Sequence, residues 1–199
     1  STDNTYDLIL ELNDKYDFVT IDQNKRNLGG GATRNRCIDL TSGEVIFCLD
    51  SDDIIEVNSL RKMYNMIISE NLDGVTFEVS EKFSRTKKNI LNKDSFKYYS
   101  DLIPITSLFT NQPNPLQVVF MIKKESHYKI KGYPEDHGFD TQGYGFRFLL
   151  NGLKAKVCNG TIYYHRIDLN NNSYYNREQN AGRINLNWQK VLSESIYIF

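Results

Sequence analysis

The 199-residue sequence predicts an α/β fold in which a mostly parallel central sheet lies between two layers of helices. Apolar segments of strand length alternate with segments in which apolar residues recur at helical spacing. The apolar run at 45–49 carries no charge on either face, which is typical of a strand covered on both sides. Three carboxylates follow this run directly, and the ligand sites of open α/β sheets lie outside the carboxyl ends of their strands.

Composition indicates one ordinary globular domain over residues 1–199, because the chain is 25% charged and 40% hydrophobic. The net charge of −1 argues against electrostatic binding to nucleic acid. No apolar run approaches the roughly 18 residues of a membrane span, so no transmembrane segment is expected. We expect a cytoplasmic protein, with a peripheral position at a membrane as the alternative. Cys37, Cys48 and Cys158 show no paired spacing and are expected to be free thiols.

The helices and strands follow from capping residues and apolar periodicity. Residues 1–5 are rich in capping side chains, so a helix is expected to begin almost at once, and Gly152 is expected to end a later one. In order, we expect that first helix, a strand at 18–21, a helix ending near 42, a strand at 45–49, a helix from about 60 to 71, a strand at 73–79, a short helix at 96–102, a strand at 116–122, a helix at 144–151, a strand at 156–165 and a helix from about 177 to 195.

The acidic tip of the strand at 45–49 predicts a cation site. Asp50, Ser51, Asp52 and Asp53 stand there together. Crowded carboxylates repel one another unless a hard divalent ion neutralises them, and Mg²⁺ or Mn²⁺ prefers oxygen ligands shared with substrate phosphates. The alternative is a capped turn in which Asp53 caps the following helix.

The glycine-rich stretch before the second helix predicts a phosphate site. Residues 29–31 are three successive glycines, which permit close approach of a ligand to the backbone at a helix N-terminus. Lys25, Arg26 and Arg34 add positive charge, so a diphosphate fits. The alternative is a flexible loop with solvated cations.

These pieces, in this order, resemble the family 2 glycosyltransferases. Residues 24–53 are similar to the family run Asn-x-Gly…Ala-Arg-Asn-x-Gly-Ile…Gly-Glu-x-Ile-x-x-Leu-Asp-Ser-Asp-Asp, with Thr33 and Cys37 as departures. Residues 1–5 resemble the end of the family motif Asp-Asp-Gly-Ser-Thr-Asp-Asn-Thr. The resemblance implies a GT-A fold, a Rossmann-like three-layer sandwich, and a βαβ unit of about 30 residues before Ser1, so we expect this chain to lack its N-terminal unit.

The resemblance also implies roles for individual residues. Asp50 and Asp52 match the family's Asp-x-Asp motif for metal and diphosphate, and Arg166 matches an arginine that meets the diphosphate. The implied metal ligands are Asp50, Asp52 and His165, and the implied donor-binding residues are Gly30, Arg34, Asn35, Asp50, Ser51 and Arg166.

Two residues are candidates for the catalytic base. The family shows Glu-Asp near the start of a helix, followed by arginine and glycine at the spacing kept here by Arg147 and Gly152. Counting back without a gap places Asp140 and Thr141 at the Glu-Asp position, and one inserted residue makes Asp140 the base. The literal Glu-Asp ends at Asp136, four residues earlier. We expect Asp140, with Asp136 as the alternative.

The implied function is transfer of a hexosyl or N-acetylhexosaminyl unit from a nucleotide-diphosphate sugar, with UDP favoured, to a glycan or lipid-linked glycan. The implied mechanism is a metal-assisted single displacement with inversion, of the kind used in polysaccharide biosynthesis. Residues 1–79 would bind the donor, 80–170 would face the acceptor, and 171–199 would form a helical tail. The alternatives are a non-catalytic glycan- or nucleotide-binding module and a metal-dependent phosphotransferase or hydrolase.

Overall fold

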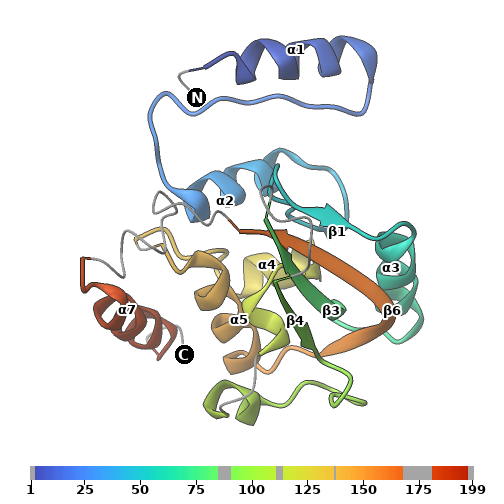
Figure 1. Ribbon diagram of the computed structural model, residues 1–199, viewed down its shortest axis with the longest axis vertical. Helices are drawn as coiled ribbons and strands as arrows, with labels where there is room; N and C mark the ends of the chain where they lie inside the picture. The colour runs from blue at the N-terminus through green and yellow to red at the C-terminus, as the bar shows by residue number, and fades with distance from the viewer. Residues whose placement is uncertain (1–2, 85–90, 111–113, 137, 168–180, 197–199) are drawn as a thin grey trace.

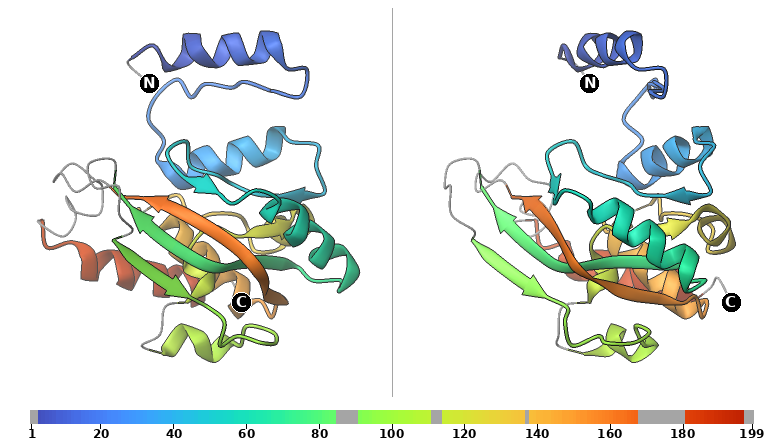
Figure 2. Two further views of the ribbon diagram at one scale, coloured as in Figure 1. Left: turned by 45° about the vertical axis from the view of Figure 1, so that its right-hand side comes forward. Right: turned by 90° about the vertical axis from the view of Figure 1, so that its right-hand side faces the viewer.

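The computed structural model describes residues 3–84, 91–110, 114–136, 138–167 and 181–196. A six-stranded sheet with the order β1-β5-β3-β6-β2 forms its centre, and β4 pairs with the remaining part of the edge of β3 (Figures 1 and 2). The strands are β1 (Val45–Ile46), β2 (Ile54–Ile55), β3 (Gly74–Phe83), β4 (Asn92–Ser95), β5 (Met121–Lys123) and β6 (Ala155–Arg166). The helices are α1 (Thr5–Lys15), α2 (Gly30–Leu40), α3 (Ser59–Ser69), α4 (Lys124–Lys129), α5 (Asp140–Leu150) and α7 (Ile184–Ile196), with 3₁₀ turns η1 (Ile105–Phe109) and η2 (Pro115–Gln117).

Helices cover both faces of the sheet, so the expected α/β sandwich is confirmed. On one face α3 buries Met63 and Ile67 against β3 and β6. On the other face α5 buries Tyr144 and Phe148, in a cluster that also takes in Ile38 of α2. Helix α7 packs outside α5 through a small third cluster. Both core layers are therefore built from apolar residues that recur at helical spacing on one helix and alternate along the strands.

The strand directions differ from the expectation of a mostly parallel sheet. Among the described pairs only β3 and β6 run parallel, and the other pairs are antiparallel. The strand at 45–49 is reduced to β1, which lies at one end of the strand order and not in the centre. The apolar run indicated burial on both faces, but it contains no information about neighbours within the sheet. Leu49, the last residue of the run, is 46% exposed.

Two expected elements are absent from the described part of the chain. Residues 18–21 pair with no described strand and therefore do not form a strand themselves. The side chain of Phe18 is 85% exposed. Residues 96–102 form turns and not a helix. Their ends are fixed on the sheet by two backbone bonds, from Phe96 N–H to the Glu78 carbonyl and from Ile103 N–H to the Ala155 carbonyl.

The strand expected at 116–122 begins later, at Met121. Asn114 accepts a hydrogen bond from the backbone N–H of Leu116, and Pro115 is the first residue of η2, so this segment folds as a capped turn. The short elements β2, β4 and α4 were not expected. Helix α5 begins at Asp140, four residues before the expected start, and Gly152 follows its end with a left-handed φ of 67°.

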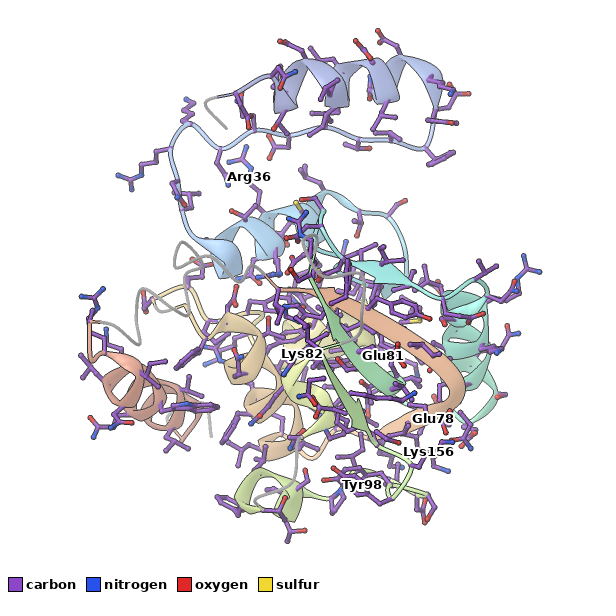
Figure 3. All side chains as sticks on the ribbon, viewed as in Figure 1. Arg36, Glu78, Glu81, Lys82, Tyr98 and Lys156 are labelled. Carbon is purple, nitrogen blue, oxygen red and sulfur yellow. The ribbon has the colours of Figure 1, made fainter. Side chains whose placement is uncertain are left out.

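Helix α1 stands apart from the rest of the fold and buries none of its residues (Figure 1). Arg36 projects from α2 toward the segment that follows α1, where it is paired with Asp22 (Figure 3). Of the expected C-terminal helix, residues 177–180 lie outside the described residues, and α7 forms the part from Ile184 on. None of the helices in the described ranges is long and apolar enough to cross a membrane.

Candidate active site

The acidic strand tip is a hydrogen-bonded turn that directs its carboxylates to two sides. The backbone N–H of Asp53 donates to the carbonyl of Asp50 at 3.1 Å, which closes the turn. Asp50 faces α2, whereas Asp52 and Asp53 face the end of β6. The turn therefore joins a helix on one side of the sheet edge to a strand end on the other.

Arg34 connects the strand tip with the start of α5. Its Nη2 donates to both carboxylate oxygens of Asp50, at 2.7 and 2.9 Å, and its Nη1 donates to Oδ2 of Asp140. These bonds join residues that are 16 and 106 positions apart in the sequence. The arrangement brings together three of the residues that the sequence singled out.

The charge of Arg34 is secured by these two carboxylates. Burial disfavours the guanidinium ion, but the charges of Asp140 and Asp50 outweigh that cost and raise the pKa of Arg34 above its ordinary value. The side chain of Asp140 is 12% exposed and that of Asp50 is 47% exposed. The Asp140 end of this ion-pair network is therefore enclosed, and the Asp50 end is accessible to a ligand.

The first turn of α2 lies directly against the loop that precedes α5. A Cβ added at Gly30 would come within 2.5 Å of Oδ2 of Asp140, and one added at Gly31 would overlap the carbonyl of Pro134. Position 31 therefore requires glycine, because the clash is with backbone, whereas a Cβ at position 30 would displace the ends of the Asp140 and Arg34 side chains. The glycines allow α2 to approach the loop before α5 closely. The expected contact of Gly30 with a donor stays a prediction.

Asp53 fixes the end of β6 beside the turn. It accepts hydrogen bonds from the Tyr163 hydroxyl and from the backbone N–H of Arg166, the latter at 2.8 Å. Burial raises the pKa of Asp53, although both hydrogen bonds favour the carboxylate. Helix α3 begins only at Ser59 after the N-cap Asn58, so Asp53 caps the end of a strand and not that helix.

The expected metal ligands do not form a ready-made metal cluster. Asp52 accepts a hydrogen bond of 2.6 Å from Arg166, and Asp50 is bonded to Arg34. The ring of His165 lies 6.0 Å from that of Tyr163, near Asp53. No group of three or more metal-ligating side chains stands together within the described ranges. Asp50 and Asp52 are both partly exposed, and to share a divalent cation with phosphate oxygens they would first have to leave their arginine partners.

The other predicted residues lie around this centre in different ways. Ser51 is exposed at the tip of the turn and lines, with Asp50 and Arg34, a cavity of about 590 Å³ between α2 and residues 43–51. Asn35 uses its amide to hold the loop before α5, with bonds to the Tyr133 backbone and to Glu135. Asp136 is exposed on that loop.

Sequence reasoning did not find two tyrosines of the site. Tyr163 is 2% exposed and donates to Asp53. Alternation along a strand places Tyr163 on the same face as His165. The alternation of β6 could therefore have indicated that Tyr163 lies at the site. Tyr133 lies beside Arg34, and no local pattern marks it, because its position depends on a loop that is about 100 residues away from Arg34 in sequence.

Comparison with known proteins identifies the family. The sequence pattern described as Glycosyl transferase family 2 matches residues 1–131, which is more than half of the chain. The chain belongs to this family. The expected family resemblance is therefore confirmed.

Individual relatives agree with this assignment. The poly(ribitol-phosphate) beta-glucosyltransferase of Bacillus spizizenii is 29% identical over 84% of this chain and 26% of its own length. An uncharacterised glycosyltransferase of Methanocaldococcus jannaschii is 26% identical over 86% of this chain and 58% of its own length. The chain thus spans only part of each of these relatives.

Solved structures confirm the fold. The crystal structure of S. aureus TarS in complex with UDP-GlcNAc superimposes with a TM-score of 0.65 at 18% identity, over 87% of this chain and 50% of that one. The same protein in complex with UDP gives a TM-score of 0.64 at 17% identity, over 84% of this chain and 49% of that one. The expected GT-A fold is therefore confirmed.

Proposed function

We propose that this family 2 domain transfers a sugar from a UDP-sugar to a hydroxyl group of a glycan or other polymeric acceptor. The observation that supports this function best is the contact of Arg34 with both Asp50 and Asp140. It joins the acidic strand tip, where a diphosphate would bind, to the carboxylate that would take a proton. A transferase needs these two groups within reach of one sugar carbon.

The donor side of the site would consist of the turn at residues 50–53, Arg34 and Arg166. The two arginines offer charge-assisted hydrogen bonds to phosphate oxygens. Ser51 is exposed at the tip of the turn. UDP is favoured because TarS, which shares the fold, is observed with UDP and UDP-GlcNAc. A divalent cation held by Asp50 and Asp52 would neutralise negative charge on the departing diphosphate.

Asp140 is the better placed of the two candidate bases. Its carboxylate reaches the Arg34 guanidinium that also holds Asp50, whereas Asp136 is exposed on the preceding loop. A carboxylate bonded to a guanidinium accepts a proton poorly. We infer that Arg34 turns toward the phosphates when the donor binds, and that this movement releases Asp140 for its role as base.

The proposed reaction is one displacement at the anomeric carbon. The acceptor oxygen forms the new bond to that carbon while Asp140 takes its proton. The bond from the anomeric carbon to the phosphate oxygen breaks, and UDP leaves with the electron pair. Attack from the side opposite the leaving group inverts the anomeric configuration.

A pair of matched variants tests this assignment. Asp140→Asn and Asp136→Asn remove the same charge from the two candidate bases. With UDP-glucose or UDP-GlcNAc, Mn²⁺ and poly(ribitol phosphate) as the first acceptor, release of UDP is measured. We expect Asp140→Asn to lower kcat by about 10²- to 10⁴-fold, since that is the usual contribution of a general base. Asp136→Asn should stay within about threefold of wild type.

Calorimetric titration of UDP into both variants separates chemistry from binding. Asp140→Asn should bind UDP within a few-fold of wild type if the carboxylate acts mainly in the proton transfer. A larger loss of kcat in Asp136→Asn than in Asp140→Asn would assign the role of base to Asp136. Full turnover in both variants would refute a carboxylate base at either position.

A further inference from the structure

A buried tyrosine lies beside the guanidinium that connects the two halves of the site. The Arg34 guanidinium carbon is 5.7 Å from the centroid of the Tyr133 ring, which is a distance at which a cation is attracted to an aromatic face. Tyr133 is 4% exposed. Its ring is stacked on that of Tyr144, with 3.8 Å between centroids and 11° between planes. Tyr133 therefore sits between the core under α5 and the charged site.

The side chain of Tyr133 lies near Cys48, in the segment between β1 and the acidic turn. Burial and the influence of the Cys48 thiol raise the pKa of Tyr133, so the hydroxyl stays protonated. Burial likewise raises the pKa of Cys48, to about 11, so the thiol is neutral. Cys48 precedes Asp50 by two residues. Tyr133 thus lies near Arg34 and also near the segment that leads to Asp50, the carboxylate partner of Arg34.

The backbone of Tyr133 is held on both sides by the residue next to Arg34. Its N–H donates to Asn35 Oδ1 at 2.8 Å, and its carbonyl accepts from Asn35 Nδ2 at 2.9 Å. The preceding residues Lys131 and Gly132 both have a left-handed φ, of 58° and 67°. Arg147 donates from Nη1 to both of their carbonyls, at 3.2 and 2.9 Å. These bonds fix the backbone that carries the Tyr133 ring.

The far end of the stack is anchored in the core. The Tyr144 hydroxyl is 2.7 Å from Nδ1 of His127, and both side chains are buried. His127 belongs to α4 and Tyr144 to α5. The aromatic stack therefore extends from two helices of the core to the guanidinium at the surface of the site.

We propose that Tyr133 is a positioning residue for Arg34, acting through the guanidinium. The aromatic surface holds the guanidinium at the acidic turn, where it contacts Asp50 and Asp140 without a donor and can turn to the donor phosphates without leaving the ring. This inference rests on the proposed function in one respect, because the ligand that Arg34 meets is taken to be the donor diphosphate. The restraint itself exists in the ligand-free protein and can be measured there.

Three variants of the protein separate positioning from stability. Tyr133→Leu removes the aromatic surface, and Tyr133→Phe keeps it while removing the hydroxyl. Phe148→Leu is the matched control, because Phe148 is a fully buried ring of the same core cluster that packs on Phe120. The first measurement is the rotation rate of the Arg34 guanidinium by ¹⁵N nuclear magnetic resonance without ligand. The second is the affinity for UDP with Mn²⁺.

We expect Tyr133→Leu to speed guanidinium rotation and to weaken UDP binding by about 3- to 30-fold, the range that a cation–π contact allows. Tyr133→Phe should keep slow rotation, and Phe148→Leu should change only the melting temperature. In an Arg34→Lys background, Tyr133→Leu should have a much smaller effect on UDP affinity, since the two residues act as one unit.

Two results would overturn the proposal. One is slow rotation of Arg34 in Tyr133→Leu, and the other is full additivity of the Tyr133 and Arg34 substitutions in UDP affinity. If the wild-type protein does not bind UDP, the proposed donor fails, and the rotation rate alone decides whether Tyr133 positions Arg34. The two failures are therefore distinguishable.

Discussion

Replacement of His127 by glutamine should remove a large part of the acid sensitivity of the fold. His127 is 2% exposed, and its Nδ1 lies 2.7 Å from the Tyr144 hydroxyl. Burial lowers the pKa of His127 to about 4, against the attraction of Asp39 and with a further lowering by Lys124. The unfolded chain has an ordinary histidine pKa of about 6.5. Glutamine is always neutral and can still bond to Tyr144.

The sign of the effect follows from where the proton binds. Between pH 6.5 and 4 the unfolded chain binds a proton on this residue and the folded chain does not, so the free energy of unfolding falls as the pH drops. The two pKa values give a loss of about 2 kcal/mol at pH 5 relative to pH 7.5. Below pH 4 this contribution changes no further.

Urea denaturation at pH 7.5 and pH 5 measures the effect. The wild-type protein should lose about 2 kcal/mol more than His127→Gln over this interval. Because the substitution also changes packing, only the change of the free energy of unfolding with pH is compared between the two proteins. Equal pH dependence in both would refute the reasoning, because it would mean that His127 is protonated as readily in the folded protein as in the unfolded chain.

Two further substitutions test the geometry of the site. Gly31→Ala should lower the free energy of unfolding by about 1–3 kcal/mol in urea denaturation, because its Cβ would overlap the Pro134 carbonyl; a gain of about 1 kcal/mol, the value from helix propensity alone, would contradict this. Tyr163→Phe should cost about 1–2 kcal/mol in the same assay, because Asp53 loses a hydrogen bond in a partly buried place. The neighbouring Tyr164→Phe is its control, and equal costs for both would refute the role of Tyr163.

The sequence predicted the elements whose pattern is local. Helix α3 follows from apolar residues at helical spacing, and the acidic turn follows from four consecutive residues after an apolar run. The glycine run marked the place where helix α2 begins. In each case the residues that define the element also form it, so no knowledge of distant segments was needed.

The features that sequence reasoning missed depend on distant contacts. The apolar run before Asp50 indicated burial but could not show that β1 pairs antiparallel with β5 at a sheet edge. The segment at 116 looked like a strand, yet Asn114 and Pro115 fold it into a turn against which α5 packs. Tyr133 lies at the site through a contact with Asn35, which is 98 positions away in sequence and binds the Tyr133 backbone.

The most direct test of the proposed donor site is calorimetric titration of UDP, with GDP as control, with and without Mn²⁺, into the wild-type protein and Asp52→Ala. Asp52 is partly exposed at the strand tip and paired with Arg166. The account predicts UDP binding that requires the metal ion and is lost in Asp52→Ala. UDP binding that is equally strong without the metal ion and in Asp52→Ala would contradict it, because the donor would then bind away from the acidic turn.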